Sequence, residues 1–414
     1  MASPDQTEAL RRPSAPPHPT STGGAKADRV RRDWQHGGFG VYVHWPFCLA
    51  KCPYCDFNSH VSRNVDQMAW RDALLREAAH MRDLTGARRV DTVFFGGGTP
   101  SLMPAETVAA IIEQIDRLWG LVPGAEVTLE ANPTSVEAAK FRDYAQAGVN
   151  RVSMGVQALN DTDLKTLGRM HSVAEAQAAF DIARSVFDRV SFDLIYARVG
   201  QDVAAWEAEL RRALDMAVDH LSLYQLTIES GTRFAELYHA GKLHPPADTI
   251  SAEMYEVTQT LTEAAGMPDY EVSNHAAPGA ESRHNCIYWR YGDYAGIGPG
   301  AHGRITVQDG LRYATETARD PAAWVKAVTV GGNALTEQTA LPAEDQATEY
   351  ALMSLRLREG MDMARYATLA GSPLSVSRVE ALVASGYLRR DGKHLAATAK
   401  GRIVLNTLLS ELLS

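Results

Sequence analysis

The chain has 414 residues, of which 45% are hydrophobic and 22% are charged, and its formal net charge is -9. This composition predicts a globular protein with a large core and at least two domains. The acidic balance gives no general basic surface for nucleic acid, and no apolar run is long enough to span a bilayer. Only four cysteines are present, which argues against a disulfide framework and predicts a reducing, cytoplasmic location.

Residues 1–37 are rich in Pro, Ser, Thr, Gly and Arg and contain almost no apolar side chains. Such a segment cannot bury enough apolar surface to fold alone, so we expect a disordered tail. An organellar transit peptide is the alternative interpretation of this segment. Early Asp5 and Glu8, together with several prolines, count against it.

Six short β-rich runs follow, and amphipathic helical stretches separate them. The runs begin near residues 41, 91, 126, 151, 189 and 220. The helical stretches lie near 66–84, 105–119, 173–187 and 204–218, with Ser172 as the predicted N-cap of the third. This alternation predicts an α/β fold built from parallel β/α units, either as an open doubly wound sheet or as a closed or partial barrel.

Polar residues stand at or near the C-terminal ends of the predicted strands. They are Glu130, Asn132, Gln157, Asp193 and Gln225. Barrel enzymes place binding and catalytic groups at this end of their strands. The pattern therefore favours a partial (β/α)6 barrel of the TIM-like kind.

Three of the four cysteines, Cys48, Cys52 and Cys55, lie close together in a C-x3-C-x2-C pattern. Three thiolates leave a structural zinc site incomplete, because zinc normally takes four protein ligands. A zinc site would need one more ligand, from His44, His60 or Cys286. A four-iron cluster needs no further residue, since three irons bind sulfur and the fourth stays open to a ligand. The triplet favours an iron–sulfur cluster.

A glycine-rich segment, GGGTPS at residues 96–101, directly follows the second strand. Glycines let a ligand approach backbone N–H groups that a side chain would shield. A tight strand-to-helix turn is the alternative, and no Walker lysine follows that would indicate a phosphate site.

These motifs resemble the radical S-adenosylmethionine (SAM) superfamily. From about residue 39 to the C-terminus the chain is similar to HemW-like haem chaperones, which are related to the oxygen-independent coproporphyrinogen III oxidases. The motifs that carry the resemblance are YVHWPFC, KCPYCDFNS, FFGGGTPS, SMGVQ, LGRMHS, FDLIY, SRHNCIYW and GIGPGAHG. The resemblance implies that Cys48, Cys52 and Cys55 bind a [4Fe-4S] cluster whose open iron binds SAM.

The same resemblance implies the residues of the SAM pocket. They are Tyr42, Gly97, Gly98, Thr99 and Glu130, and Gln157, Arg169 and Asp193 would contact a second SAM or the substrate region. Alternatively, Arg169 is a surface cation and Asp193 a helix cap. The chain departs from its relatives after the fifth strand, where it reads DLIYARVGQ instead of DLIYGLPGQ. Ala197, Arg198 and Val199 therefore put the shape of the substrate side in doubt.

The segment at residues 282–303 carries an H-N-x-x-Y-W core that resembles the haem-associated segment of HemW-like proteins. His284 is the expected axial ligand of haem iron, with Tyr288 and Trp289 as a flat aromatic wall. A structural hydrogen bond of His284 within an aromatic core is the alternative. His302 is a weaker candidate ligand, and Cys286 is expected to be a buried, unreactive thiol.

The residue at position 57 distinguishes between the two functions that the resemblance allows. The oxidases carry a further cysteine two positions after the last cluster cysteine, whereas here Cys55 is followed by Asp56 and Phe57. The resemblance thus implies a haem chaperone that carries haem as cargo to acceptor haemoproteins, with respiratory enzymes as the expected acceptors. Peripheral membrane association would come through such partners. Radical decarboxylation of coproporphyrinogen is the alternative function.

We expect the barrel at residues 38–240, a barrel extension with the H-N-x-x-Y-W segment at 241–335 and a further domain at 336–414. In this C-terminal domain a pair of helical stretches, a short hairpin and a final helix resemble a winged-helix unit. It is locally basic, with Arg389, Arg390, Lys393, Lys400 and Arg402. Because the whole chain is acidic, we expect no nucleic-acid partner.

Overall fold

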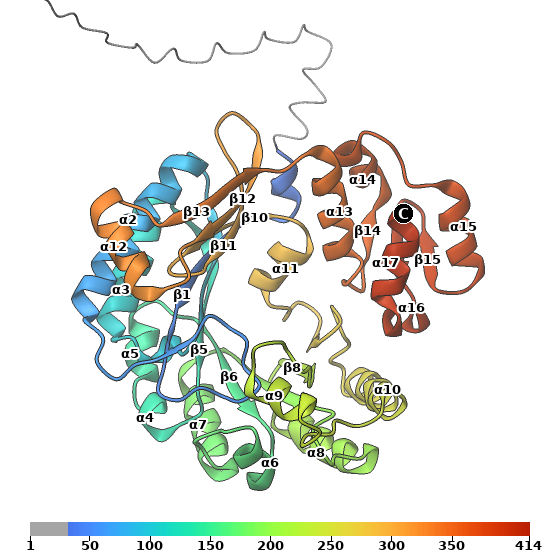
Figure 1. The fold of residues 1–414 in the computed structure, drawn as a ribbon, viewed down its shortest axis with the longest axis horizontal. Coiled ribbons are helices and arrows are strands. Elements are labelled where there is room, and N and C mark those ends of the chain that lie inside the picture. Colours follow the sequence, from blue (N-terminus) through green and yellow to red (C-terminus); the bar gives the residue numbers. More distant parts are fainter. Residues whose placement is uncertain (1–31) are drawn as a thin grey trace, which may run out of the picture.

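The computed structural model describes residues 32–414. Its main feature is an eleven-stranded sheet whose central region contains six neighbouring parallel strands (Figure 1). They are β1 (Phe39–Trp45), β4 (Val90–Gly97), β5 (Leu121–Ala131), β6 (Arg151–Gln157), β7 (Arg189–Tyr196) and β8 (His220–Gln225). These are the six predicted strands, and the partial (β/α)6 barrel is confirmed.

The sheet continues beyond both ends of this parallel set. On one side β10 (Asp293–Ile297) pairs with β1 in parallel, followed by antiparallel β11 (His302–Thr306), β12 (Arg312–Thr317) and β13 (Leu335–Ala340). On the other side β9 (Asn274–Ala276) pairs with β8 in antiparallel fashion. The two outermost strands, β13 and β9, are not neighbours in the hydrogen-bonding order. The barrel is therefore open.

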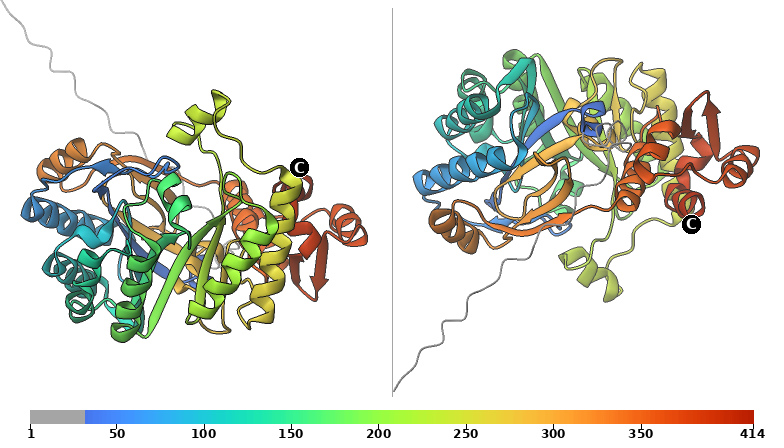
Figure 2. Two further views of the ribbon diagram at one scale, coloured as in Figure 1. Left: turned by 90° about the horizontal axis from the view of Figure 1, so that it is seen from below. Right: turned by 90° about the horizontal axis from the view of Figure 1, so that it is seen from above.

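Helices cover the outer side of the parallel strands (Figure 2). They include α2 (Gln67–Thr85), α3 (Ala105–Trp119), α4 (Ser135–Ala138), α5 (Phe141–Gln146), α6 (Asp161–Thr166), α7 (Val173–Val186), α8 (Val203–Met216) and α10 (Asp248–Ala264). Ser172 caps α7 and forms a reciprocal capping box with Glu175, which confirms the predicted N-cap. Helix α9 (Arg233–His239) stands out from the body of the molecule (Figure 2).

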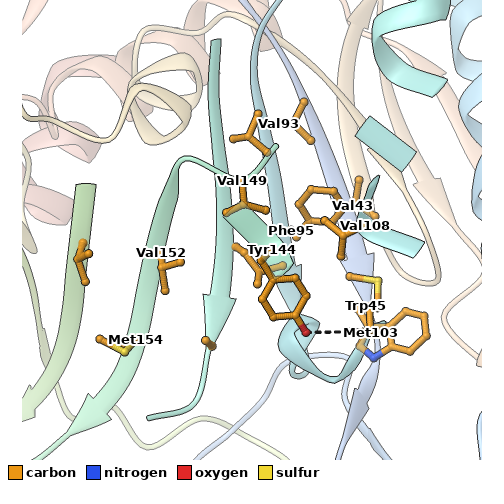
Figure 3. Packing of buried hydrophobic residues seen from close by; sticks show 14 of the residues in the cluster. Val43, Trp45, Val93, Phe95, Met103, Val108, Tyr144, Val149, Val152 and Met154 are labelled. Atoms are coloured by element: carbon orange, nitrogen blue, oxygen red, sulfur yellow. Dashed lines mark hydrogen bonds between the residues drawn. The ribbon is translucent and has the colours of Figure 1, made fainter. Parts of the chain in front are cut away.

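The core lies between these helices and the outward-facing side chains of the strands. Alternate residues of each strand point outward, as the two-residue period of a strand requires. Figure 3 shows Val43, Trp45, Val93, Phe95, Val152 and Met154 in this layer, all fully buried. Tyr144 of α5 packs among them and donates a hydrogen bond from its hydroxyl to the carbonyl oxygen of Met103 (2.8 Å).

Residues 241–335 have no separate core. Side chains from β10, β11 and α12 (Pro321–Gly331) belong to the same apolar cluster as the barrel strands. The predicted extension therefore packs against the barrel as a continuation of it. The short helix α11 (Arg283–Trp289), which carries the H-N-x-x-Y-W segment, lies between the sheet and the C-terminal unit (Figure 1).

The C-terminal unit has its own apolar cluster, mostly from residues 347–412. Its elements run α13 (Ala343–Ser354), β14 (Met361–Asp362), α14 (Met363–Ala370), α15 (Val376–Ala384), β15 (Leu388–Asp391), β16 (His394–Ala397), α16 (Ala399–Ile403) and α17 (Leu405–Leu413). In chain order, one helix is followed by a strand, two helices and a hairpin. The three strands of this unit form one small sheet. This order is that of a winged-helix unit, as predicted.

Part of the predicted disordered tail, residues 1–37, is folded. Residues Asp33–His36 form a 3-10 helix, η1, and Asp33 is buried against Arg365 of α14. The tail prediction failed here because this packing partner lies more than 300 residues away in the sequence. The remainder of the predicted tail, residues 1–31, lies outside the described residues. None of the helices in residues 32–414 is both long enough and apolar enough to cross a membrane.

Candidate functional site

The cysteine loop, residues 46–62, joins β1 to α2 and is fixed at both of its ends. Short strands β2 (Phe47–Cys48) and β3 (His60–Val61) pair in parallel across it. Asn58 donates from Nδ2 to the carbonyl oxygens of Pro299 and Arg319, both at 2.9 Å. The loop is thus tied to the sheet extension on the far side of β1.

The three clustered cysteines line one cavity at the C-terminal ends of the barrel strands. Seven of the eight residues expected to contact SAM or substrate line the same cavity: Gly97, Gly98, Thr99, Glu130, Gln157, Arg169 and Asp193. Asn132 also lines it, whereas Gln225 does not and is exposed at the end of β8. Four of the five polar residues at the predicted strand ends therefore lie around the cysteine loop.

Tyr42, the eighth residue, does not line this cavity. Its hydroxyl lies 3.0 Å from Nδ1 of His44, and its ring stacks on Phe94 of the next strand. Nε2 of His44 lies 2.9 Å from the carbonyl oxygen of Asn58. Tyr42 therefore supports the cysteine loop indirectly, through His44.

The donor set fits a four-iron cluster better than a single zinc ion. Both ring nitrogens of His44 are already engaged, and Cys286 lines a different cavity. Within residues 32–414, no three His, Cys, Asp or Glu side chains converge on a position for one metal ion. A cluster does not require this convergence, since each thiolate binds a separate iron. Cys48, Cys52 and Cys55 would hold it, and burial raises the pKa of Cys48 and Cys55, so both would lose a proton on binding iron.

The glycine-rich segment packs against the cysteine loop. The amides of Gly98 and Thr99 donate to the carbonyl oxygens of Trp45 (2.7 Å) and Phe47 (2.9 Å). A Cβ atom at Gly98 would lie 2.8 Å from the Phe47 oxygen, so a larger residue does not fit. These two amides are used within the protein, which differs from the expectation that they face a ligand. The Thr99 hydroxyl instead donates to Sγ of Cys48 at 3.4 Å.

Three carboxyl groups line the cavity, and two of them, Glu130 on β5 and Asp193 on β7, were expected there. Burial, together with the nearby Asp193, raises the pKa of Glu130 to about 8. Burial likewise raises the pKa of Asp193 to about 6, although Ser222 and Ser153 donate hydrogen bonds to it. Neither carboxyl forms a salt bridge with a described residue. Two carboxyls with raised pKa values can stabilise a cationic ligand such as the SAM sulfonium.

Arg169 is not a free surface cation, because it is partly buried beside the cysteines and its guanidinium is bonded within the protein. Its Nη1 donates to Sγ of Cys52 at 3.3 Å, and its Nη2 donates to Asn132 Oδ1 (2.6 Å) and to the carbonyl oxygen of Gly155 (2.8 Å). Arg169 therefore joins the cysteine loop to the ends of β5 and β6. Asp193 likewise lies in the cavity and caps no helix.

Several lining residues were not predicted, among them Lys51, Tyr54, Phe57, Ser153, Gly155, Met170 and His171. Met170 and His171 belong to the LGRMHS motif, of which only Arg169 was singled out. The alternation of side chains along β6 places Ser153, Gly155 and Gln157 on one face. That alternation was the signal that would have identified Ser153.

The haem candidates lie in α11, away from this cavity. Nδ1 of His284 lies 2.6 Å from the Thr92 hydroxyl and Nε2 lies 2.7 Å from the Tyr288 hydroxyl. His284 is 1% exposed, and burial lowers its pKa to about 3, so the ring is neutral. Tyr288 packs edge-on against Tyr294, and Arg356 covers Trp289. In this arrangement His284 offers no free nitrogen, and Tyr288 and Trp289 form no open wall.

The other two candidates in this region are also placed by the structure. Cys286 is buried, and burial raises its pKa to about 12, which agrees with an unreactive thiol. His302 stands on β11 with its side chain largely exposed, near Glu316.

The unusual turn after β7 does not reach the main cavity. Ala197 adopts a φ of 56°, in the left-handed region that favours glycine. The Arg198 guanidinium is buried and pairs with Asp163 and Glu209. Arg198 and Val199 line a separate cavity beside α8. The doubt about the shape of the substrate side therefore does not extend to the residues around the cysteines.

Comparisons with known proteins agree with this geometry. The family model of the radical SAM superfamily matches residues 42–213, and that of the HemN C-terminal domain matches residues 341–404. Among solved structures, coproporphyrinogen III oxidase (HemN) from Escherichia coli, a radical SAM enzyme, superposes with a TM-score of 0.75 over 92% of each chain. At 22% identity this likeness shows the fold alone.

Two groups of curated relatives are more similar in sequence. The mouse radical S-adenosyl methionine domain-containing protein 1, mitochondrial, is 41% identical, covering 90% of this chain and 87% of the relative. Heme chaperone HemW from Escherichia coli is 36% identical, covering 89% of this chain and 96% of the relative. HemW from Haemophilus influenzae is 34% identical with the same coverage. The chain belongs to the HemW family of radical SAM proteins.

Proposed function

We propose that this protein is a haem chaperone that binds haem and passes it to acceptor haemoproteins. The observation that carries the proposal is the similarity to HemW over 96% of the relative's length. The chain also has Phe57 where the oxidases carry a further cysteine. Similarity to the oxidase itself rests on the fold, so no observation favours coproporphyrinogen oxidation.

The cavity around the cysteines is proposed to hold a [4Fe-4S] cluster and SAM. When bound, the cluster supplies an electron donor beside the SAM sulfonium. The chain's own residues orient this site: Arg169 fixes the cysteine loop on β5 and β6. Asp193, and Glu130 once it ionises, provide negative charge in the depth of the cavity.

We expect respiratory haem enzymes as acceptors and contact with membranes only through them. A cytoplasmic location is proposed for this chain, although the mouse, cattle and zebrafish relatives are named as mitochondrial proteins. Fractionation of cells that express the tagged full chain would test the location.

Haem titration of the anaerobically reconstituted protein tests the function. We expect a saturable Soret band and transfer of the bound haem to an apo-haemoprotein. His284→Ala, with exposed His239→Ala as its matched control, tests the axial ligand that the sequence predicted; unchanged haem affinity removes His284 from that role. Wild-type protein without haem binding would contradict the proposal, and so would turnover of coproporphyrinogen to protoporphyrinogen with SAM and a reductant.

A further inference from the structure

Three large apolar side chains are exposed where the main cavity opens. Leu49 is 46% exposed, Phe57 62% and Met170 68%, and all three line the cavity together with the cysteines. Isolated exposed apolar residues are ordinary on a protein surface, but a group of them around one opening indicates a binding surface. We call Leu49, Phe57 and Met170 the apolar rim.

The charges of the cavity separate its depth from this rim. The carboxyls of Glu130, Asp193 and Glu137 line the cavity, and burial raises the pKa of each. Lys51 lines it from the cysteine loop, is exposed and forms no salt bridge with any residue that the structure describes. A cation is therefore favoured in the depth. A flat apolar molecule with carboxylates is favoured at the rim, with a carboxylate near Lys51.

Phe57 gives the rim its aromatic surface at the position where the oxidases carry a further cysteine. Its ring is not in contact with any other aromatic ring among residues 32–414, although most aromatic side chains of the barrel are paired. An exposed aromatic ring gains most when another flat surface covers it. The haem macrocycle is a ligand with such a surface.

We propose that haem binds on the apolar rim, with one macrocycle face against Phe57, Leu49 and Met170 and a propionate beside Lys51. This inference rests on the proposed chaperone function and names the site for its cargo. Haem would therefore bind at the opening of the main cavity beside the cysteines. It would not bind at α11, where both nitrogens of His284 are bonded within the protein. Bound haem would then cover the cavity.

Haem titration of rim variants of the full, anaerobically reconstituted chain tests the site. Phe57→Ala/Met170→Ala should weaken haem binding at least roughly tenfold, because two large apolar contacts are lost. Met68→Ala/Val330→Ala is the matched control, since both residues are exposed but line no portion of the cavity. Lys51→Glu should also weaken binding, and the loss should shrink as salt is added. His284→Ala should leave the affinity unchanged.

A second measurement tests the rim site separately from the haem chaperone function. If haem covers the cavity, it should slow the loss of cluster iron to a chelator in the wild type and not in Phe57→Ala/Met170→Ala. Wild-type protein that binds no haem would remove the proposed function. Haem binding that survives the rim substitutions, or that His284→Ala abolishes, would overturn the rim site and leave the chaperone function standing.

Discussion

Glu130 is a carboxyl of the main cavity whose charge changes with pH near neutrality. It lies at the end of β5, and both burial and the neighbouring Asp193 raise its pKa, to about 8. A carboxyl whose pKa is raised in the folded state stabilises the protein below about 4.5, and this contribution is lost as the pH rises through about 8. The free protein thus keeps Glu130 largely neutral near pH 7.

We predict that SAM binding strengthens as Glu130 ionises. The sulfonium is cationic, so its affinity should rise by up to roughly tenfold per pH unit between about pH 6 and pH 8. Glu130→Gln should bind SAM more weakly above pH 8 and show a flatter pH profile, with a residual slope from Asp193 near pH 6. Calorimetric titration of reconstituted protein from about pH 5.5 to 9 measures this.

Glu113→Gln on the exposed face of α3 is the control for this experiment, because it removes a carboxyl far from the cavity. Its SAM affinity and pH profile should match the wild type. An unchanged slope in Glu130→Gln would show that another group binds the sulfonium.

At the scale of single residues, the local sequence predicted some site residues and misjudged others. The cysteines were predicted from their C-x3-C-x2-C spacing, and Glu130 and Asp193 from their positions at strand ends, and both signals are local properties of the chain. His284 was predicted as a haem ligand because nothing in its own segment reveals Thr92, the hydroxyl that engages Nδ1 from 192 residues away. The role of a buried histidine depends on such distant partners, which a single sequence does not specify.

At the scale of elements, local signals were sufficient for the strands and most of the helices. The period of two along β6 and the Ser172–Glu175 capping box of α7 are readable from a few neighbouring residues. Strand pairing is not local: β10 lies beside β1 although about 250 residues separate them. The sequence predicted a barrel extension at 241–335, but it did not specify that β10 of this extension pairs with β1.

The turn between β7 and α8 carries a conformational cost that can be measured. Ala197 has a φ of 56°, and a side chain in this region costs about 1–2 kcal/mol relative to glycine. Glycine loses more entropy on folding, which offsets about 0.5–1 kcal/mol of the gain. Ala197 is also buried in the main apolar cluster, so glycine loses the burial of one methyl group, worth about 0.8 kcal/mol. We predict that Ala197→Gly changes the free energy of unfolding by less than about 1 kcal/mol in urea titrations.

Ala208→Gly in the middle of α8 is the matched control, since the residue is exposed and helical. It should lower the free energy of unfolding by about 1 kcal/mol. If both substitutions destabilise the protein equally, the left-handed conformation of Ala197 carries no cost. The main cavity should be unaffected in both variants, because Ala197 does not line it.

At the scale of the whole molecule, a buried ion pair joins three regions of the chain. Asp33 of η1 accepts two hydrogen bonds from Arg365 of α14, both at 2.8 Å. Arg365 also donates to the carbonyl oxygens of Arg290 and Tyr291, next to α11. Arg312 of β12 lies 3.7 Å from the same carboxylate. The C-terminal unit is thus fastened to the barrel beside the H-N-x-x-Y-W segment.

We predict that Asp33→Ala loosens the C-terminal unit more than the barrel. It leaves the buried Arg365 guanidinium without its carboxylate, which costs about 3 kcal/mol. Hydrogen exchange should accelerate in α13 to α17 and remain slow in β4 to β7. Asp188→Ala, an exposed carboxylate in the loop before β7, should change neither region.

The double variant Asp33→Ala/Arg365→Met decides whether the penalty comes from the uncompensated charge. Replacing both partners removes the buried guanidinium, so we expect the double variant to recover some of the lost protection in α13 to α17. If the double variant is as loose as Asp33→Ala, the two units depend on the hydrogen bonds of Arg365 to the Arg290 and Tyr291 carbonyls instead. In that case α11 itself, and not η1, holds the C-terminal unit against the barrel.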